Sequence, residues 1–223
     1  MLLLAVDTSG KHGSIALARC GPEADCSVIE VVPLDGGIFS AQLVPQIAAL
    51  LVKHGLDKLD IGAFAVVSGP GSFTGLRIGL AAIKALAEVF SKPIAAVSLL
   101  EAIAVAGGQR GKVIAVLDAG RGDVYAGEYQ VKNSEVQLER ERLLTRSELM
   151  QTAVGSVVVT ADHSLAQAAR DGSLQVEEIE VPGSDAIARL GWRKILAGNT
   201  LSPAELDANY IRRSSELFSK GSS

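Results

Sequence analysis

The sequence predicts an α/β protein built from two similar lobes. Hydrophobic residues make up 48% of its 223 residues and charged residues 21%, which is typical of a folded globular protein. Aromatic residues reach only 4%, and this composition favours helices layered on sheets. The pattern of strands and helices in the first half begins again at Lys112. We therefore expect one lobe over residues 1–108 and a second over residues 109–223.

The first half reads as three strands followed by alternating helices and strands. Short apolar segments rich in β-branched residues, separated by glycine-containing turns, predict the strands. Longer segments with an apolar face, such as the one that Gly55 ends, predict the helices. The predicted strands are 2–6, 14–19, 28–32, 61–67 and 93–97, and the predicted helices are 40–54, 74–90 and 98–106.

The second half repeats this order. Leu4-Ala-Val-Asp-Thr8 and Ala115-Val-Leu-Asp-Ala119 hold equivalent places at the end of each first strand. Thr145 and Glu148 have the spacing of a capping box at a helix start. The predicted strands are 113–117, 124–131, 135–139, 157–160 and 175–181, and the predicted helices are 147–153, 164–170 and 185–197.

The helix at 74–90 has an unusual surface. Most of its residues are small or apolar, so it must be covered on more than one side. Gly71, Gly75 and Gly79 recur every fourth residue and form a smooth edge that another backbone could approach closely. That neighbour is either another part of the same domain or a helix of a second protein chain. Ser72 or Thr74 is expected to cap the helix.

Composition and spacing argue against several function classes. The net charge of −4 and the pI near 5.4 argue against nucleic-acid binding by this chain alone. No apolar run reaches the ~18 residues of a membrane span. The loop after residue 67 lacks both the Walker pattern and the third glycine of the dinucleotide pattern. Cys20 and Cys26 match neither a metal site nor a disulfide framework, which indicates a reducing cytoplasm.

Duplicated lobes in this order resemble the actin-like ATPase architecture, also called ribonuclease H-like or ASKHA. Three segments narrow the match, and the chain resembles the TsaB (YeaZ) family. The resemblance covers most of the chain and is diffuse after Tyr129, apart from 210–212. The three segments are Leu4-Ala-Val-Asp-Thr8, Ser68-Gly-Pro-Gly-Ser-Phe-Thr-Gly-Leu-Arg-Ile-Gly79 and Leu117-Asp-Ala-Gly-Arg-Gly-Asp-Val-Tyr125.

This resemblance implies a cytoplasmic, non-catalytic partner of the enzyme TsaD. Together with TsaE, such proteins serve the formation of the threonylcarbamoyl group on N6 of the tRNA adenosine beside the anticodon. The family implies dimerisation through helices 40–54 and 74–90, with a TsaD homologue or with a second copy. The expected partner-binding residues are Phe73, Gly75, Leu76, Arg77, Gly79, Leu80, Ile83, Leu43 and Ile47.

Few residues could carry chemistry of their own. His12, His54 and His163 are scattered, and no Gly-x-Ser-x-Gly elbow is present, so we expect no metal and no catalytic residue. An actin-like turn could still hold nucleotide phosphate, and the alternative is that its aspartate only closes the turn. The open possibilities are ATP or ADP with magnesium at the partner junction, or an autonomous ATPase or small-molecule kinase. The nucleotide-binding candidates are Asp7, Thr8, Asp118 and Arg121.

Overall fold

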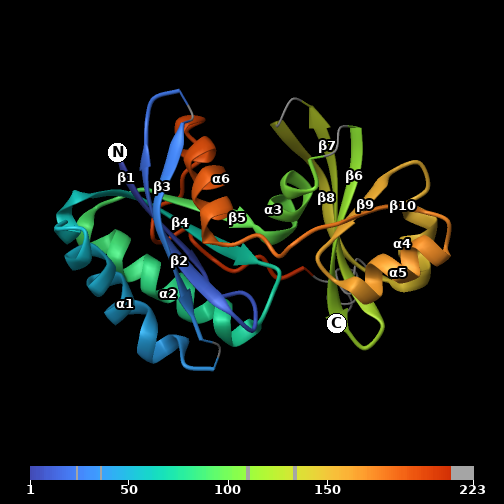
Figure 1. Cartoon of the computed structure of the whole chain (residues 1–223), viewed down its shortest axis with the longest axis horizontal. Coiled ribbons are helices and arrows are strands. Elements are labelled where there is room, and N and C mark those ends of the chain that lie inside the picture. The colour runs from blue at the N-terminus through green and yellow to red at the C-terminus, as the bar shows by residue number, and fades with distance from the viewer. Residues whose placement is uncertain (24, 36, 109–110, 133–134, 212–223) are drawn as a thin grey trace, which may run out of the picture. The chain divides into compact units, whose positions relative to one another are not determined.

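The computed structural model describes residues 1–23, 25–35, 37–108, 111–132 and 135–211, so Arg212 lies outside it. The chain forms two compact units, drawn in Figure 1. The first contains Met1–Leu99 and Pro182–Asn209, and the second contains Leu100–Val181. Within the described ranges, every helix is too short or too polar to cross a membrane.

The first unit is a five-stranded sheet with helices on both faces. Its strand order is β3-β2-β1-β4-β5, with β1 antiparallel to β2 and parallel to β4. Helices α1 and α2 lie against one face, and α6 packs on the other (Figure 1). The strands are β1 (Leu2–Asp7), β2 (Gly13–Cys20), β3 (Cys26–Leu34), β4 (Ile61–Gly69) and β5 (Ile94–Ser98), and the helices are α1 (Phe39–Lys53), the short 3-10 helix η1 (Lys58–Asp60), α2 (Phe73–Phe90) and α6 (Ser184–Leu196).

A row of alanines lets α6 approach this sheet closely. The strand registers align Ala16, Ala5, Ala65 and Ala95 side by side across β2, β1, β4 and β5. Gly191 of α6 lies directly over the β-carbons of this row, where a side chain of its own would collide with Ala65. Small residues on both surfaces therefore bring the helix backbone down onto the sheet.

The second unit repeats the topology of the first. Its sheet has the order β10-β9-β6-β7-β8. Read from the opposite edge, this is the order of the first sheet with each strand number raised by five. This confirms the predicted repeat of an actin-like α/β lobe. The strands are β6 (Gly111–Gly120), β7 (Asp123–Lys132), β8 (Glu135–Thr145), β9 (Val157–Thr160) and β10 (Gln175–Glu178), and the helices are α3 (Leu99–Ala106), α4 (Arg146–Thr152) and α5 (His163–Asp171).

The two units exchange their third helices, so they divide the chain differently from the predicted 1–108 and 109–223. Helix α3 follows the first sheet in sequence but packs in the second unit, where the Cβ of Leu100 lies close to Gly127. Helix α6 follows the second sheet but packs on the first. Sequence order is a poor guide to this boundary, because each helix covers a sheet made by the other half of the chain.

Strand β8 is longer than predicted, since it runs to Thr145 rather than to residue 139. The part beyond the predicted strand begins with the charged residues Arg140-Glu-Arg142, which the sequence pattern assigns to no helix or strand. These residues pair with β7, and Glu128 lies directly opposite Arg140. The capping box of Thr145 and Glu148 is confirmed at the start of α4.

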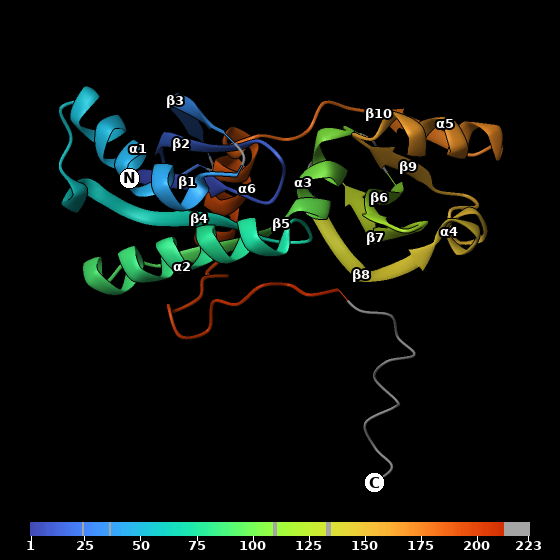
Figure 2. The same cartoon turned by 90° about the horizontal axis from the view of Figure 1, so that it is seen from below.

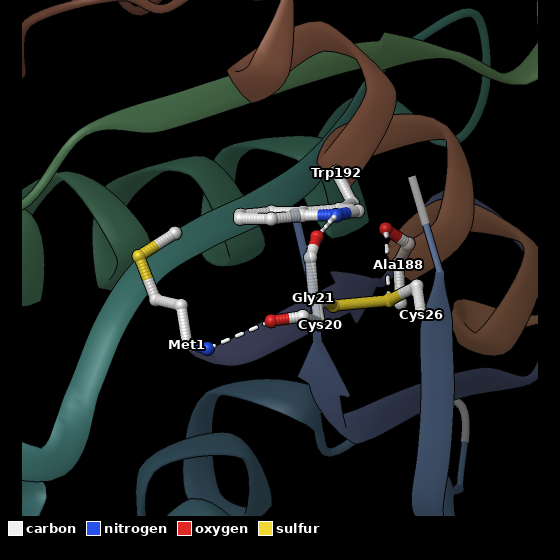
Figure 3. The surroundings of a disulfide bond; sticks show 6 residues. All are labelled: Met1, Cys20, Gly21, Cys26, Ala188 and Trp192. Atoms are coloured by element: carbon white, nitrogen blue, oxygen red, sulfur yellow. Dashed lines mark hydrogen bonds between the residues drawn. A yellow bond between two sulfur atoms is a disulfide. The ribbon is translucent and has the colours of Figure 1, made fainter. Parts of the chain in front are cut away.

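Cys20 and Cys26 form a disulfide, so the interpretation that excluded one was wrong. The two residues lie opposite each other at the ends of β2 and β3 rather than in a loop. Figure 3 shows Trp192 of α6 beside this bond, donating a hydrogen bond of 2.9 Å from Nε1 to the carbonyl of Gly21. The hairpin end and α6 are therefore fastened together.

A C-terminal strap crosses the first unit after α6, below α2 in the view of Figure 2. Leu201 bridges to Ile94 of β5, and the backbone N–H of Asn209 donates to the carbonyl of Ser68 at 2.8 Å. Lys84 of α2 donates from Nζ to the carbonyl of Leu206 at 3.0 Å. The strap thus ties β4, β5 and α2 together.

Candidate interaction surface

The start of α2 is fixed by the turn between β1 and β2. Ser72 is the N-cap, and its hydroxyl accepts a hydrogen bond from the backbone N–H of Gly75 at 3.3 Å. The backbone N–H of Ser72 itself donates to the carbonyl of Ser9 at 2.7 Å. A Cβ at Gly71 would lie 2.6 Å from that same carbonyl oxygen. The loop thus lies directly on the β1–β2 turn.

The glycine edge of α2 faces the chain's own β1–β2 turn, not solvent. A Cβ on Gly75 would collide with the carbonyl of Thr8, and a Cβ on Gly79 with the hydroxyl of Thr8. Thr8 in turn donates from Oγ1 to the carbonyl of Gly75 at 2.8 Å. The sequence left two possible neighbours for this glycine edge, another part of the same domain or a second protein chain. In the structure the neighbour is Thr8, which belongs to the same domain.

Most of the predicted partner-binding residues lie inside the first unit. Phe73 and Arg77 stay exposed at the start of α2, and the guanidinium of Arg77 lies 3.7 Å above the centre of the Phe73 ring. That cation–π pair stiffens two large side chains at the surface. The buried remainder is Leu43, Ile47, Gly75, Leu76, Gly79, Leu80 and Ile83.

The outer surfaces of α1 and α2 together form an apolar face. The two helices pack against each other and lie side by side in Figure 1. Val52 is 77% exposed and Val89 is 74% exposed, although both are large aliphatic residues. Helical spacing could have revealed this stripe, since its members recur every three or four residues on each helix. We call it the α1–α2 face; it comprises Ala41, Val44, Ala48, Val52, Ile78, Ala81, Ala85 and Val89.

The predicted nucleotide residues Asp7 and Thr8 are occupied by contacts within the first unit. Oδ1 of Asp7 accepts hydrogen bonds from the backbone N–H and the hydroxyl of Ser9, at 2.8 and 2.6 Å. Asp7 is 5% exposed and Thr8 is 2% exposed. The carboxylate therefore closes its own turn, and the Thr8 hydroxyl is bonded to α2. This arrangement does not fit a phosphate clamp that offers free donors to a ligand.

Asp118 and Arg121 belong to the second unit, at the turn equivalent to that of Asp7 and Thr8. Arg121 lies in the left-handed region with φ of 57°, between two glycines of the β6–β7 turn. Asp118 is partly exposed and lies 3.8 Å from Nη2 of Arg146, a distance at which an exposed ion pair contributes little.

The three histidines lie in three separate places. His12 is exposed in the β1–β2 turn. His54, after α1, is 2.7 Å from a carboxylate oxygen of Glu30, and His163 of α5 is 2.9 Å from one of Glu178. In the described ranges, no three His, Cys, Asp or Glu side chains gather as metal ligands would.

We expect replacement of Asp7 by asparagine to stabilise the protein at neutral pH. Burial raises the pKa of Asp7 above its ordinary 3.8, and hydrogen bonds from Ser9 oppose the rise only in part. The native carboxyl thus binds more protons than the unfolded one between pH 3.8 and its raised pKa. Its stabilising contribution is present below pH 3.8 and is lost as pH rises through the folded pKa. Asparagine keeps the acceptor for Ser9 without the buried charge.

Urea unfolding at several pH values from 4 to 8 measures this effect. The native chain should lose stability relative to Asp7→Asn as the pH rises. Asp35→Asn, a change at an exposed position, is the control and should run parallel to the native chain. An Asp7→Asn variant that is less stable at pH 7 would mean that the fold requires the charge.

Comparison with known proteins shows which protein family this chain resembles in sequence. A family model described as TsaD, tRNA N6-adenosine threonylcarbamoyltransferase, matches residues 36–186. The tRNA threonylcarbamoyladenosine biosynthesis protein TsaB of Bacillus subtilis is 31% identical over 207 residues, which are 92% of this chain and 85% of that protein. The chain belongs to the TsaB family.

One further relative agrees with TsaB membership, and a solved structure shares the fold. TsaB of Escherichia coli is 34% identical over 133 residues, covering 58% of this chain and 55% of that protein. The solved structure of YeaZ from Pseudomonas aeruginosa aligns with a TM-score of 0.77 at 24% identity, over 94% of this chain and 99% of that one. The shared fold agrees with the predicted α/β architecture of two similar lobes.

Proposed function

We propose that this chain is a non-catalytic partner subunit that pairs with a TsaD homologue when the threonylcarbamoyl group is attached to tRNA. The relatives named TsaB support its place in that biosynthesis. The observation that carries the pairing is the α1–α2 face, where eight small or apolar residues lie along two helices that pack together, with Val52 77% and Val89 74% exposed. Apolar patches of this kind on soluble proteins mark contact surfaces.

The composition of the α1–α2 face favours helices as its partner. Ala81 and Ala85 would let a helix axis come close, while Val44 and Val89 at the edges would fill the grooves beside it. A second copy of this chain presents the same face, so we propose that a homodimer and the TsaD heterodimer compete for it. Phe73 and Arg77 lie at the end of the face and would contact the partner at the edge of the interface.

Chemistry by this chain alone is not part of the proposal. Asp7 and Thr8 are engaged inside the fold, which favours a subunit without a nucleotide of its own. We propose that any ATP or ADP with magnesium is held at the junction with TsaD, and that a TsaE homologue joins the assembly in the cytoplasm. These points follow from the family and would be tested on the reconstituted complex.

The test uses two valines with similar exposure. Val89 lies on the α1–α2 face and is 74% exposed, and Val181 lies between β10 and α6 and is 69% exposed. In a complex, Val89→Glu would bury a charge against apolar side chains at a cost of about 3 kcal/mol or more, or about a hundredfold in affinity. We expect it to abolish co-purification with TsaD and modification of tRNA.

The matched change Val181→Glu should leave TsaD binding and modification at the native level. Light scattering on the isolated chains should show the homodimer weakened by Val89→Glu alone. Native TsaD binding by the Val89→Glu variant would place the partner elsewhere. Native modification without TsaD binding would contradict the subunit role itself.

A further inference from the structure

The second unit holds a charged cavity of about 320 Å³ that contains none of the predicted site residues. It lies where the β6, β7 and β8 part of the sheet meets the end of α4 and the segment after it. Its volume is within the range of cavities that hold small molecules. The lining residues are Lys112, Val113, Ile114, Glu128, Tyr129, Glu139, Arg140, Arg142, Thr152, Val154 and Ser156.

The charged residues of this cavity lie on the same face of the second sheet as its hydrophobic core. Ile114 of β6, Ala126 of β7 and Leu144 of β8 belong to the hydrophobic core under α4 and α5. Side chains two residues apart on a strand lie on the same face of the sheet. Two residues from these core positions, toward the cavity, the three strands carry Lys112, Glu128 and Arg142. The unit therefore changes from an apolar core to a charged surface within one step along three neighbouring strands.

Glu128 holds two guanidinium groups in fixed positions. It accepts from Nε and Nη2 of Arg140 at 2.8 and 3.1 Å, and from Nε and Nη2 of Arg142 at 3.0 and 2.7 Å. Ala126 lies opposite Arg142 in the neighbouring strand, and its small side chain leaves room for this reach. Burial tends to raise the pKa of Glu128, but the bonds from both arginines outweigh it and lower the pKa.

Cationic donors remain in the cavity after these bonds. None of the bonds to Glu128 uses Nη1 of Arg140 or Arg142. Lys112 forms no ion pair within the described ranges, and its side chain also lines the cavity. With Glu139 counted, three cations face two carboxylates, which leaves a net charge of +1 in a chain whose net charge is −4.

We propose that this cavity binds the phosphate group of a small phosphomonoester. Two guanidiniums held by a shared carboxylate and one lysine form a cationic set that matches a group with three acceptor oxygens. The hydroxyls of Thr152 and Ser156 suit the polar remainder of such a molecule. The mostly polar lining is unsuited to an apolar ligand. The site needs only the second unit, so it stands apart from the proposed pairing with TsaD.

The experiment is a calorimetric titration of the purified full chain with adenosine 5′-monophosphate, inorganic phosphate, adenosine and succinate. We expect saturable binding of the monophosphate and of phosphate, and no binding of adenosine or succinate. Arg140→Met and Lys112→Met should each weaken monophosphate binding by about tenfold or more, the loss expected for one charge-assisted hydrogen bond.

Arg170→Met is the matched control. Arg170 pairs with Glu178 at 2.9 Å and is partly exposed, much as Arg140 pairs with Glu128, but it does not line the cavity. Its variant should bind within twofold of the native chain, and circular dichroism should show all three variants folded. Absence of saturable phosphate binding would overturn the proposal. So would equal affinity in all variants, or binding of single-stranded RNA through Arg140 without binding of the monophosphate.

Discussion

The fragment of residues 1–108, made alone, is expected to stay unfolded. It contains the whole first sheet with α1 and α2 but lacks α6, which covers the other face. The buried large side chains of α6 are Ile187, Leu190 and Trp192. At about 1.5–3 kcal/mol each, their loss removes roughly 5–9 kcal/mol, comparable to the 5–15 kcal/mol by which domains are stable.

A second chain tests the cause. It joins Met1–Leu99 to Pro182–Asn209 through a flexible glycine–serine linker and so restores α6 and the strap. Circular dichroism and urea unfolding should show a cooperative transition for this joined chain and none for 1–108. A cooperative transition in both would mean that α6 is dispensable. Failure of both would mean that the first unit also requires the second.

The variant Gly79→Leu is expected to lose most of its stability, although leucine is the better helix former. The new Cβ would collide with the Thr8 hydroxyl, and the remaining side chain has no space between α2 and the β1–β2 turn. Overpacking usually costs about 1–3 kcal/mol, and more where the obstructing atoms cannot move. Thr8 cannot move away without breaking its bond to Gly75, so we expect at least 3 kcal/mol.

The control lies two residues along the same helix. Ala81 is exposed, and Ala81→Leu should change the free energy of unfolding by less than about 0.5 kcal/mol. The pair also separates two roles of α2, since Ala81→Leu alters only the α1–α2 face. An unchanged urea midpoint for Gly79→Leu, with its homodimer lost, would show that Gly79 faces a partner instead.

The order of strands and helices could be predicted because it depends on local patterns. The apolar segment 2–6, the glycine turns and the Thr145–Glu148 spacing each determine their element within a few residues. Contacts between distant elements carry no such signal. Nothing near Gly191 specifies that it packs on Ala65, more than a hundred residues earlier, so the exchange of α3 and α6 was invisible.

The candidate site shows the same division. The glycine edge of α2 correctly indicated a close backbone, but the sequence could not say whether Thr8 or a partner would occupy it. For Asp7, the sequence allowed two interpretations, phosphate binding and closure of its own turn. The hydrogen bonds from Ser9 support closure of the turn. The arginines of β8 were missed because the predicted strand ended at residue 139, whereas Glu128 on the neighbouring strand accepts hydrogen bonds from both of them.

The exchange of third helices has a consequence for biosynthesis of the chain. A ribosome that has completed Leu99 must add 110 more residues before it reaches Asn209, the end of the first unit. At about 5–20 residues per second this takes roughly 5–20 s. Until α6 (Ser184–Leu196) has been made, one face of the first sheet has no helix to cover it, whereas the segment Leu100–Val181 of the second unit is complete before α6 begins. The whole second sheet is thus synthesised before the first sheet receives the helix that covers its other face.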